Sequence, residues 1–188
     1  GRKYIDATLG GGGHTQDILT KGGRVLGIDQ DEEAIEYVTA LLQEEEGEDK
    51  EAVQLVRGNF REIDEIAKTN GFPEVAGILF DLGVSSHQLN TPERGFSFQK
   101  AGPLDMRMDQ GLSVRAADLV NGLTKQELAD LFFKLGEEYR SREVAQAIVH
   151  ARVKKPIEST SELEKIVRHA LGSRFSGGWA RNIASSGD

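Results

Sequence analysis

The chain has 188 residues and a formal net charge of −8, and 38% of its residues are hydrophobic. This length and apolar content suit one medium-sized globular domain, or a core that carries an insertion. The sequence has no cysteine, which excludes disulfides, thiolate metal sites and cysteine nucleophiles, and its four histidines show no metal-ligand spacing. We therefore expect chemistry that uses no bound metal.

Neither a membrane anchor nor a secretion signal is visible. No apolar run reaches the roughly 20 residues of a membrane-spanning helix, and no signal peptide precedes the first apolar run. We expect a cytoplasmic protein with no membrane partner. The charge is uneven, because residues 139–182 contain nine Lys/Arg and four Asp/Glu. This basic segment leaves two readings open, a polyanionic partner and an ordinary solvated helical surface.

The first eighty residues alternate between two hydrophobic patterns. Short apolar runs are typical of strands, and the segments between them carry apolar residues at helical spacing. The expected strands are 4–9, 24–29, 52–56 and 75–81, and the expected helices are 15–21, 32–45 and 62–69. This alternation predicts an α/β fold, a doubly wound parallel sheet covered on both faces. Ligands of such sheets lie at the carboxyl ends of the strands.

A distinctive residue follows each expected strand. The first leads into four consecutive glycines beginning at Gly10, the second ends in Asp29, the third is followed by Phe60, and the fourth ends in Asp81. Glycine lets a ligand approach the backbone closely. An acidic residue after the second strand suits the ribose hydroxyls of a nucleoside, and an aromatic ring can cover an adenine. The alternatives are a plain glycine turn and an Asp29 that only caps the following helix.

The glycine spacing distinguishes between two adenosyl ligands. The dinucleotide-binding fingerprint requires a third glycine where this chain has Thr15. The Asp-x-x-x-Gly-x-Gly spacing from Asp6 to Gly12 instead resembles the first motif of class I methyltransferases. This resemblance favours S-adenosyl-L-methionine as the cofactor. A nicotinamide-dependent oxidoreductase is the less favoured alternative.

Three later motifs narrow the resemblance. They are Asp81-Leu-Gly-Val-Ser-Ser-His-Gln-Leu89, Glu93-Arg-Gly-Phe-Ser-Phe98 and Gly102-Pro-Leu-Asp-Met-Arg-Met-Asp109. Together with the stretch from Tyr4 to Thr15, they resemble the MraW family of bacterial 16S ribosomal RNA cytosine-N4 methyltransferases, and the resemblance extends to about Leu171. It implies a class I (Rossmann-like) methyltransferase core with a helical insertion. The implied partner is small-subunit ribosomal RNA or the assembling small ribosomal subunit.

The resemblance also assigns residues to the methyl donor. Gly10 opens the glycine motif, and the donor contacts carried over by position are Gly12, Gly13, His14, Asp29, Phe60, Asp81 and Gln88.

The expected chemistry is consistent with the composition. A sulfonium donor needs no metal, so the enzyme chiefly aligns the nucleophile with the methyl carbon. Methylation at cytosine C5 uses a cysteine, which is absent here, so an exocyclic amine or a hydroxyl is the better acceptor. Asp81 is the expected catalytic residue, because it can accept hydrogen bonds from a cytosine N4 amine. The alternative is a turn aspartate that bonds local backbone N–H groups.

Residues 83–112 show little periodicity, which is typical of a functional loop. This expected substrate loop contains Arg94, Phe96, Phe98 and Arg107, whose rings and guanidinium groups could stack on an extruded base and hold phosphate. The two phenylalanines could equally be packing anchors.

From Ser113 onward the pattern is helical. Capping boxes are expected at Thr124 and Ser161, each followed by Glu three residues later. We expect an α/β core over 1–112, a helical insertion over 113–172 and a flexible tail over 173–188. The candidates for phosphate contacts in the insertion are Arg140, Arg142, Arg152, Lys154 and Lys155.

Two features suggest a chain that is truncated at both ends. The opening segment and the later strands of the family are not recognised in it. A non-catalytic module that binds the donor or RNA is therefore the main alternative function. The fourth strand would then expose an unpaired edge at Ile78–Phe80, which either helices or a second copy in a homodimer would cover.

Overall fold

The computed structural model of the chain describes residues 1–44 and 52–172. These residues form two compact units. The first contains Gly1–His87 and Met108–Leu112, and the second contains Gln88–Arg107 and the chain from Ser113. The predicted tail over 173–188 lies outside the described residues. Each unit is described below by itself.

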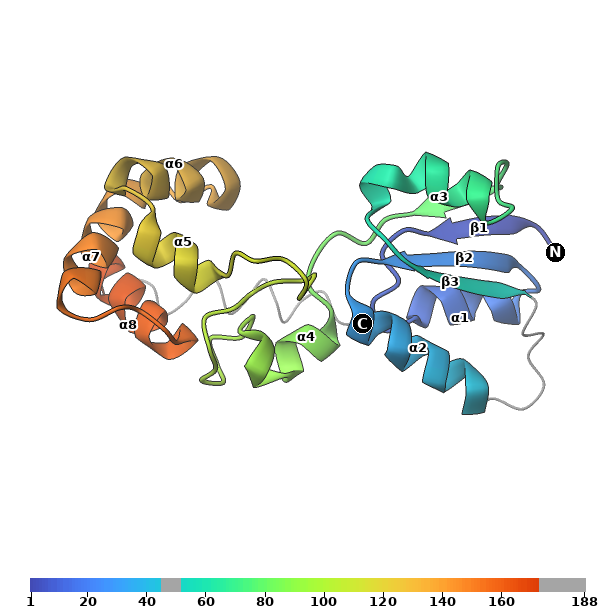
Figure 1. Cartoon of the computed structure of the whole chain (residues 1–188), viewed down its shortest axis with the longest axis horizontal. Helices are drawn as coiled ribbons and strands as arrows, with labels where there is room; N and C mark the ends of the chain where they lie inside the picture. Colours follow the sequence, from blue (N-terminus) through green and yellow to red (C-terminus); the bar gives the residue numbers. More distant parts are fainter. Residues whose placement is uncertain (45–51, 173–188) are drawn as a thin grey trace. The chain divides into compact units, whose positions relative to one another are not determined.

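The first unit is a parallel four-stranded sheet with the order β3-β2-β1-β4 (Figure 1). Its strands are β1 (Lys3–Asp6), β2 (Arg24–Asp29), β3 (Val53–Arg57) and β4 (Gly77–Leu79). Its helices are α1 (Gly13–Thr20), α2 (Glu32–Glu44) and α3 (Ile63–Thr69). The predicted α/β fold is confirmed, and the strand order reverses between β1 and β4, where such sheets bind ligands.

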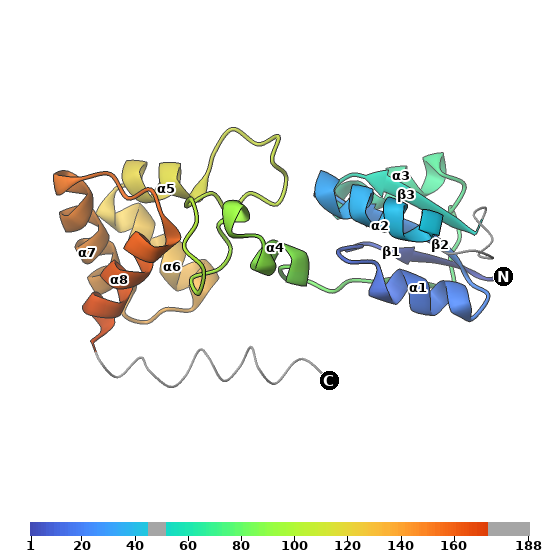
Figure 2. The ribbon, with the colours of Figure 1, turned by 90° about the horizontal axis from the view of Figure 1, so that it is seen from below.

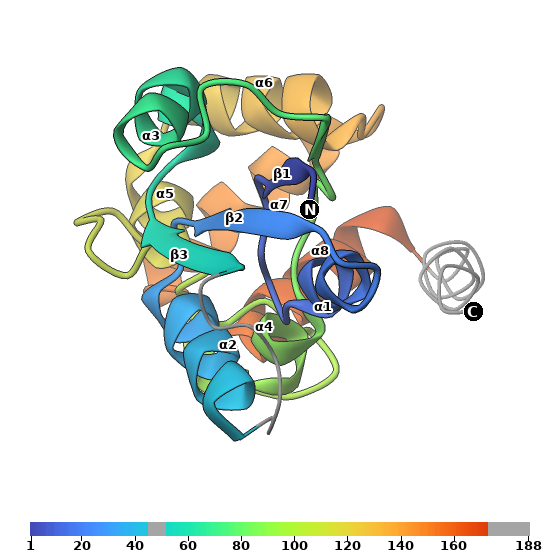
Figure 3. The same ribbon diagram turned by 90° about the vertical axis from the view of Figure 1, so that its right-hand side faces the viewer.

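Helices cover both faces of this sheet, as Figure 3 shows with α3 on one side and α1 and α2 on the other. Two separate apolar clusters lie on the two faces. One is built around Leu9, Val38 and Leu42, and the other contains Ile5, Ala7, Leu26, Ile28, Ala67 and Phe72. Burial on both faces explains why the central strand β2, in which Val25 to Ile28 are all buried, is a continuous apolar run rather than an alternating pattern.

The ends of the outer elements differ from the prediction. The strand β1 ends at Asp6 rather than Leu9, although Leu9 N–H still donates to the Ile28 carbonyl at 3.0 Å. The strand β4 is only three residues long, because within the described residues it pairs with β1 alone. Ile78 and Phe80 are each 48% exposed on this edge. Pairing of that edge with a second copy stays a prediction.

The second unit is helical. Its helices are α5 (Ala116–Gly122), α6 (Lys125–Gly136), α7 (Ser141–Lys154) and α8 (Thr160–Leu171). They enclose a core whose members include Leu128, Val144, Ala145, Ile148 and Ile157.

Residues 88–107 belong to this helical unit. The prediction from sequence had placed the whole substrate loop 83–112 with the α/β core. Leu104 is buried in the helical core, and its N–H donates to the Glu158 carbonyl at 2.8 Å. Pro103 forms an antiparallel bridge with Ser159. The loop is also less irregular than expected, since it contains α4 (Ser86–Asn90) and a 3₁₀ turn at Pro92–Arg94 (Figure 2).

One of the two predicted capping boxes is at a different place. Thr124 and Glu127 form the expected box at α6. At α8 the box is Ser159 with Glu162, two residues before the predicted Ser161. Thr160, which follows the cap, is buried, and its N–H donates to the Gly102 carbonyl at 3.0 Å. This tertiary bond, which no local pattern shows, accompanies the earlier start of α8.

Glu162 leads to a pH-dependent prediction. Its carboxylate accepts bonds from Lys155 Nζ at 2.8 Å and from the Glu158 N–H at 3.0 Å, and these lower its pKa from 4.5 to about 2. A lowered pKa stabilises the fold above pH 4.5 and the stabilisation is lost as the pH falls toward 2. We expect Glu162→Gln to lower the free energy of unfolding by about 1 kcal/mol near neutral pH, the usual effect of losing a helix cap. The effect is no larger because the side chain is 36% exposed and solvent screens its ion pair.

Urea unfolding of the wild type and the variant, followed from about pH 7 down to about pH 3, measures this difference. The gap should narrow as the pH falls. The control Glu158→Gln removes a neighbouring exposed carboxylate that does not cap α8, and it should change stability little at either pH. A gap that is constant with pH would contradict the assigned role.

Candidate donor-binding and catalytic site

The glycine turn joins β1 to α1 at the carboxyl edge of the sheet. Gly10 and Gly12 have positive φ angles of 49° and 79°, which disfavour residues with a side chain. A Cβ on Gly12 would lie 2.9 Å from a methyl group of Val38, so packing against α2 also requires glycine there. A Cβ on Gly11 or Gly13 would meet nothing within 4 Å. The turn is therefore closely packed on its inner side and open on its outer side.

A buried hydrogen bond braces this turn from below. Thr15 Oγ1 donates to Asp6 Oδ2 at 2.8 Å, and both residues are fully buried. Burial raises the pKa of Asp6, and the bonds from Thr15 and from the Thr8 N–H oppose that rise. Thr15 stands where the dinucleotide fingerprint has its third glycine, and a glycine could not make this bond. The departure from that fingerprint therefore has a structural reason.

Asp29 links the end of β2 to the glycine turn. Its Oδ2 accepts from the Gly10 N–H at 2.9 Å, and its Oδ1 accepts from the Asp31 N–H at 2.9 Å. The alternative role for Asp29, capping the next helix, falls to Asp31, whose Oδ1 accepts from the Glu33 N–H at 3.2 Å. A carboxylate has about four acceptor positions, so Asp29 keeps capacity for ligand hydroxyls while its orientation is fixed.

Two aromatic rings stand at this edge of the sheet. Phe60 and Phe80 contact edge to face, with ring centroids 5.7 Å apart and planes at 89°. They are 39% and 48% exposed, so both rings have free surface for a flat ligand. Sequence reasoning found Phe60 and missed Phe80. The signal for Phe80 was its position directly before Asp81 at the end of an apolar run.

Asp81 has a fixed backbone and an open side chain. Its N–H donates to Thr8 Oγ1 at 2.7 Å, a contact that nothing in the sequence indicated. Its Oδ2 lies 3.7 Å from His14 Nε2, and the two side chains are 74% and 52% exposed. Within residues 1–44 and 52–172, no backbone N–H donates to the Asp81 carboxylate, so the turn-aspartate alternative is not what the structure shows. The carboxylate is available to a substrate.

The segment 108–112 returns to the first unit beside β3 and α2. Arg57, the last residue of β3, donates to Asp109 Oδ1 at 3.0 Å and to Glu32 at 2.8 Å. Gln110 Nε2 donates to Glu33 at 2.7 Å. The end of the third motif thus lies at the carboxyl edge of the sheet, in the same unit as Asp29 and Phe60.

The other predicted ligand and RNA residues lie in the second unit. Gln88 is buried in α4 and only 5% exposed. Arg94 is 4% exposed, donates to the Arg107 carbonyl at 2.9 Å and lies 5.9 Å from the Phe96 ring centre. These groups hold the segment together.

The two remaining members of the predicted loop set differ, because Arg107 is bonded within the loop and Phe98 is exposed. Arg107 donates to both Asp105 oxygens at 2.8 Å and lowers the pKa of that carboxyl. Phe98 is 46% exposed and thus accessible to a base.

In the first unit, an open glycine turn, an acidic anchor, two exposed rings and an exposed carboxylate therefore share one sheet edge. These residues fit an adenosyl ligand, because they offer ribose acceptors, aromatic surface and close backbone approach. In the part of the chain that the structure describes, no group of three acidic or histidine side chains could hold a metal ion. None of the described helices is long and apolar enough to cross a membrane.

Comparison with known proteins gives a consistent result. Residues 1–176 match the sequence model of the MraW methylase family. The chain is also 48% identical over 177 residues to a protein of Thermomicrobium roseum named ribosomal RNA small subunit methyltransferase H. That alignment covers 93% of this chain and 53% of the relative, so the chain spans about half the length of the curated relative.

Proposed function

Because this chain belongs to the MraW methylase family, we propose that its first unit binds S-adenosylmethionine for methylation of the N4 amine of a cytidine in 16S ribosomal RNA. The partner is small-subunit ribosomal RNA, free or in the assembling subunit, and such a substrate implies a cytoplasmic location. The observation that carries the proposal is the bond between Asp29 Oδ2 and the Gly10 N–H, which joins the acidic anchor to the glycine turn.

Donor binding follows from the residues at this edge. Asp29 accepts hydrogen bonds from the two ribose hydroxyls, because each of its oxygens has one acceptor position left beside its backbone bond. The turn around Gly12 and Gly13 accommodates the methionine part against bare backbone. Phe60 covers one face of the adenine. The donor contact assigned to Gln88 by resemblance stays a prediction.

The reaction needs little acid–base chemistry from the protein. When bound, the donor supplies a methyl carbon whose bond to sulfur breaks as a bond to the N4 nitrogen forms. Asp81 accepts a hydrogen bond from the amine, which helps its lone pair leave conjugation with the ring, and then takes the N4 proton and passes it to water. His14, whose Nε2 lies 3.7 Å from Asp81 Oδ2, orients that carboxylate.

The nicotinamide alternative has no specific observation in its favour. Thr15 replaces the third glycine of the dinucleotide fingerprint, which allows close packing of the first helix on the strand, and its bond to Asp6 braces the turn. These residues therefore favour a methyl donor over a nicotinamide dinucleotide.

Nucleoside analysis by mass spectrometry tests the proposed reaction. The protein is incubated with isotope-labelled S-adenosylmethionine and either unmodified 16S RNA or small subunits lacking the modification. The expected product is labelled N4-methylcytidine at one position. Labelled C5-methylcytidine would contradict the proposal, and donor binding without any labelled nucleoside would instead support the non-catalytic module.

A further inference from the structure

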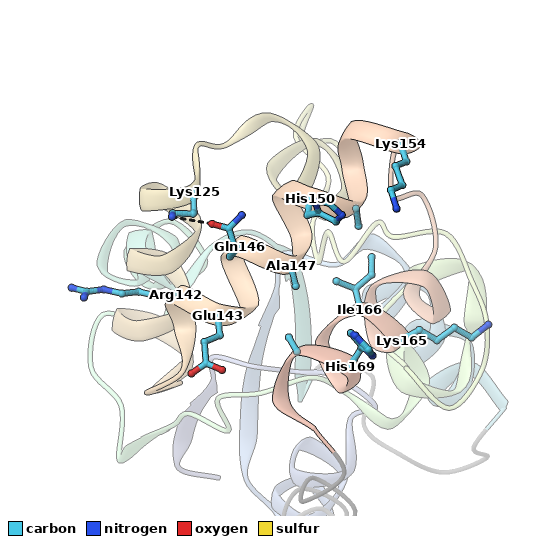
Figure 4. Close-up of a pocket in the computed structure, with 12 residues that line it drawn as sticks. Lys125, Arg142, Glu143, Gln146, Ala147, His150, Lys154, Lys165, Ile166 and His169 are labelled. Carbon is cyan, nitrogen blue, oxygen red and sulfur yellow. Dashed lines mark hydrogen bonds between the residues drawn. The ribbon is translucent and has the colours of Figure 1, made fainter.

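An open groove of about 930 Å³ lies on the helical unit between α7 and α8, with Lys125 of α6 at its margin (Figure 4). We call it the α7–α8 groove and define it by its cationic side chains Arg142, Lys154 and Lys165. None of the residues assigned to the methyl donor lines this groove.

The groove is positively charged although the chain as a whole is acidic. Arg142, Lys154 and Lys165 are exposed and, among the residues that the structure describes, have no acidic partner. The acidic side chain in the lining is Glu143, which is paired with Arg140. Three uncompensated cations around one concave surface favour a ligand with several negative charges.

Two of the three cations, Arg142 and Lys154, lie on one polar row of α7. Arg142, Gln146, His150 and Lys154 recur every four residues along α7, so they form one row on the helix surface. A row of twelve residues is about 18 Å long at 1.5 Å per residue. This length can match several consecutive phosphates of a nucleic-acid strand, and a single phosphate or a compact anion would use only part of it.

The groove also offers surface for bases. Its floor contains the small residues Ala147, Ala151 and Ala170, which let a chain approach the helix backbones closely. His150 and His169 come from the two facing helices, as Figure 4 shows. Imidazole rings stack on unpaired bases and also hydrogen-bond to phosphate, which is the usual way to hold single-stranded RNA.

The predicted phosphate contacts divide accordingly. Arg140 donates to the Leu171 carbonyl at 2.7 Å, Arg152 donates to the Val120 carbonyl at 2.7 Å, and Lys155 pairs with Glu162. These three stabilise the helical unit.

From these observations we propose that the α7–α8 groove binds the sugar–phosphate backbone of an unpaired segment of the ribosomal RNA substrate. The inference rests on the proposed function for the identity of the RNA. It assigns the contacts to Arg142, Lys154 and Lys165, with the two histidines against the bases.

Fluorescence anisotropy with a labelled, unstructured RNA of about 20 nucleotides from 16S RNA tests this assignment. The triple variant R142Q/K154Q/K165Q should bind at least tenfold more weakly than the wild type. The slope of log affinity against log salt should become shallower by about 2, the value for three lost contacts to a single strand. The control variant has the same change in net charge outside the groove and should bind within about twofold of the wild type: K21Q/K68Q/K134Q.

A second variant guards against a change in folding. Ala147→Glu places an acidic side chain on the groove floor, and it should weaken RNA binding while the helical content and the unfolding midpoint stay near those of the wild type. Equal affinity of the groove variants and the control for RNA would overturn the proposal. So would equally tight binding of poly-glutamate, which would make the groove a general site for acidic chains, or equal binding of a duplex of the same length.

Titration of S-adenosylmethionine into the same variants separates this inference from the proposed function. Groove variants that bind the donor normally but lose RNA support the groove assignment. Absence of donor binding by the wild type would overturn the proposed function. The RNA measurement would still test the groove in that case.

Discussion

Replacing Asp81 by Asn should slow methyl transfer by a factor of about 10² to 10⁴, the usual contribution of a positioned proton acceptor. Asn keeps the shape and can accept one hydrogen bond, but it cannot take the N4 proton. The Asp81 side chain is 74% exposed, so the substitution should leave the fold intact. Single-turnover transfer from labelled donor to small-subunit RNA, with donor saturating, measures the chemical step.

The control for this experiment is Glu74→Gln, which removes an exposed carboxylate before the amino end of β4, at the opposite end of the strand. It should transfer methyl groups at the wild-type rate. Donor binding by Asp81→Asn should stay measurable. A slower rate would then reflect the chemical step rather than failure to bind the donor. A variant that turns over within about threefold of the wild type would show that Asp81 is not the proton acceptor.

Replacing Asp29 by Ala should weaken donor binding at least about a hundredfold. Two hydrogen bonds from ribose hydroxyls to a charged acceptor are lost, each worth about 1.5–3 kcal/mol. The backbone groups of Gly10 and Asp31 also lose their acceptor, so the turn loosens. Asp29→Asn retains the shape and one acceptor oxygen, and it should fall between the wild type and Asp29→Ala.

Titration calorimetry with S-adenosylmethionine gives these affinities. The matched control is Asp64→Ala on α3, whose carboxylate pairs with Lys68 on the surface and should not affect the donor. Equal donor affinity for wild type and Asp29→Ala would mean that the acidic anchor does not contact the ligand.

The α/β unit was largely predictable because its signals are local. The strands around Val25 and Leu26 are buried on both faces, so continuous apolar runs marked them. Asp29 was recognised from its place after such a run. Its bond to the Gly10 N–H was not predicted, because it joins residues 19 positions apart.

The rest depends on contacts that no local pattern shows. Residues 88–107 pack with the helices through Leu104 and Pro103, and their irregular sequence gave no sign of that partner. The cap of α8 moved to Ser159, where Glu162 bonds the Ser159 N–H. Arg140 and Lys154 looked equivalent in sequence, but the first bonds the end of α8 and the second lines an open groove.

The most direct test of the central claim is a pair of titrations into this chain, one with S-adenosylmethionine and one with NADH. The account predicts micromolar affinity for the methyl donor, about −8 kcal/mol, and no detectable binding of the dinucleotide. Absence of donor binding by a folded protein, or a preference for NADH, would contradict the assignment of the glycine turn and Asp29 to a methyltransferase site.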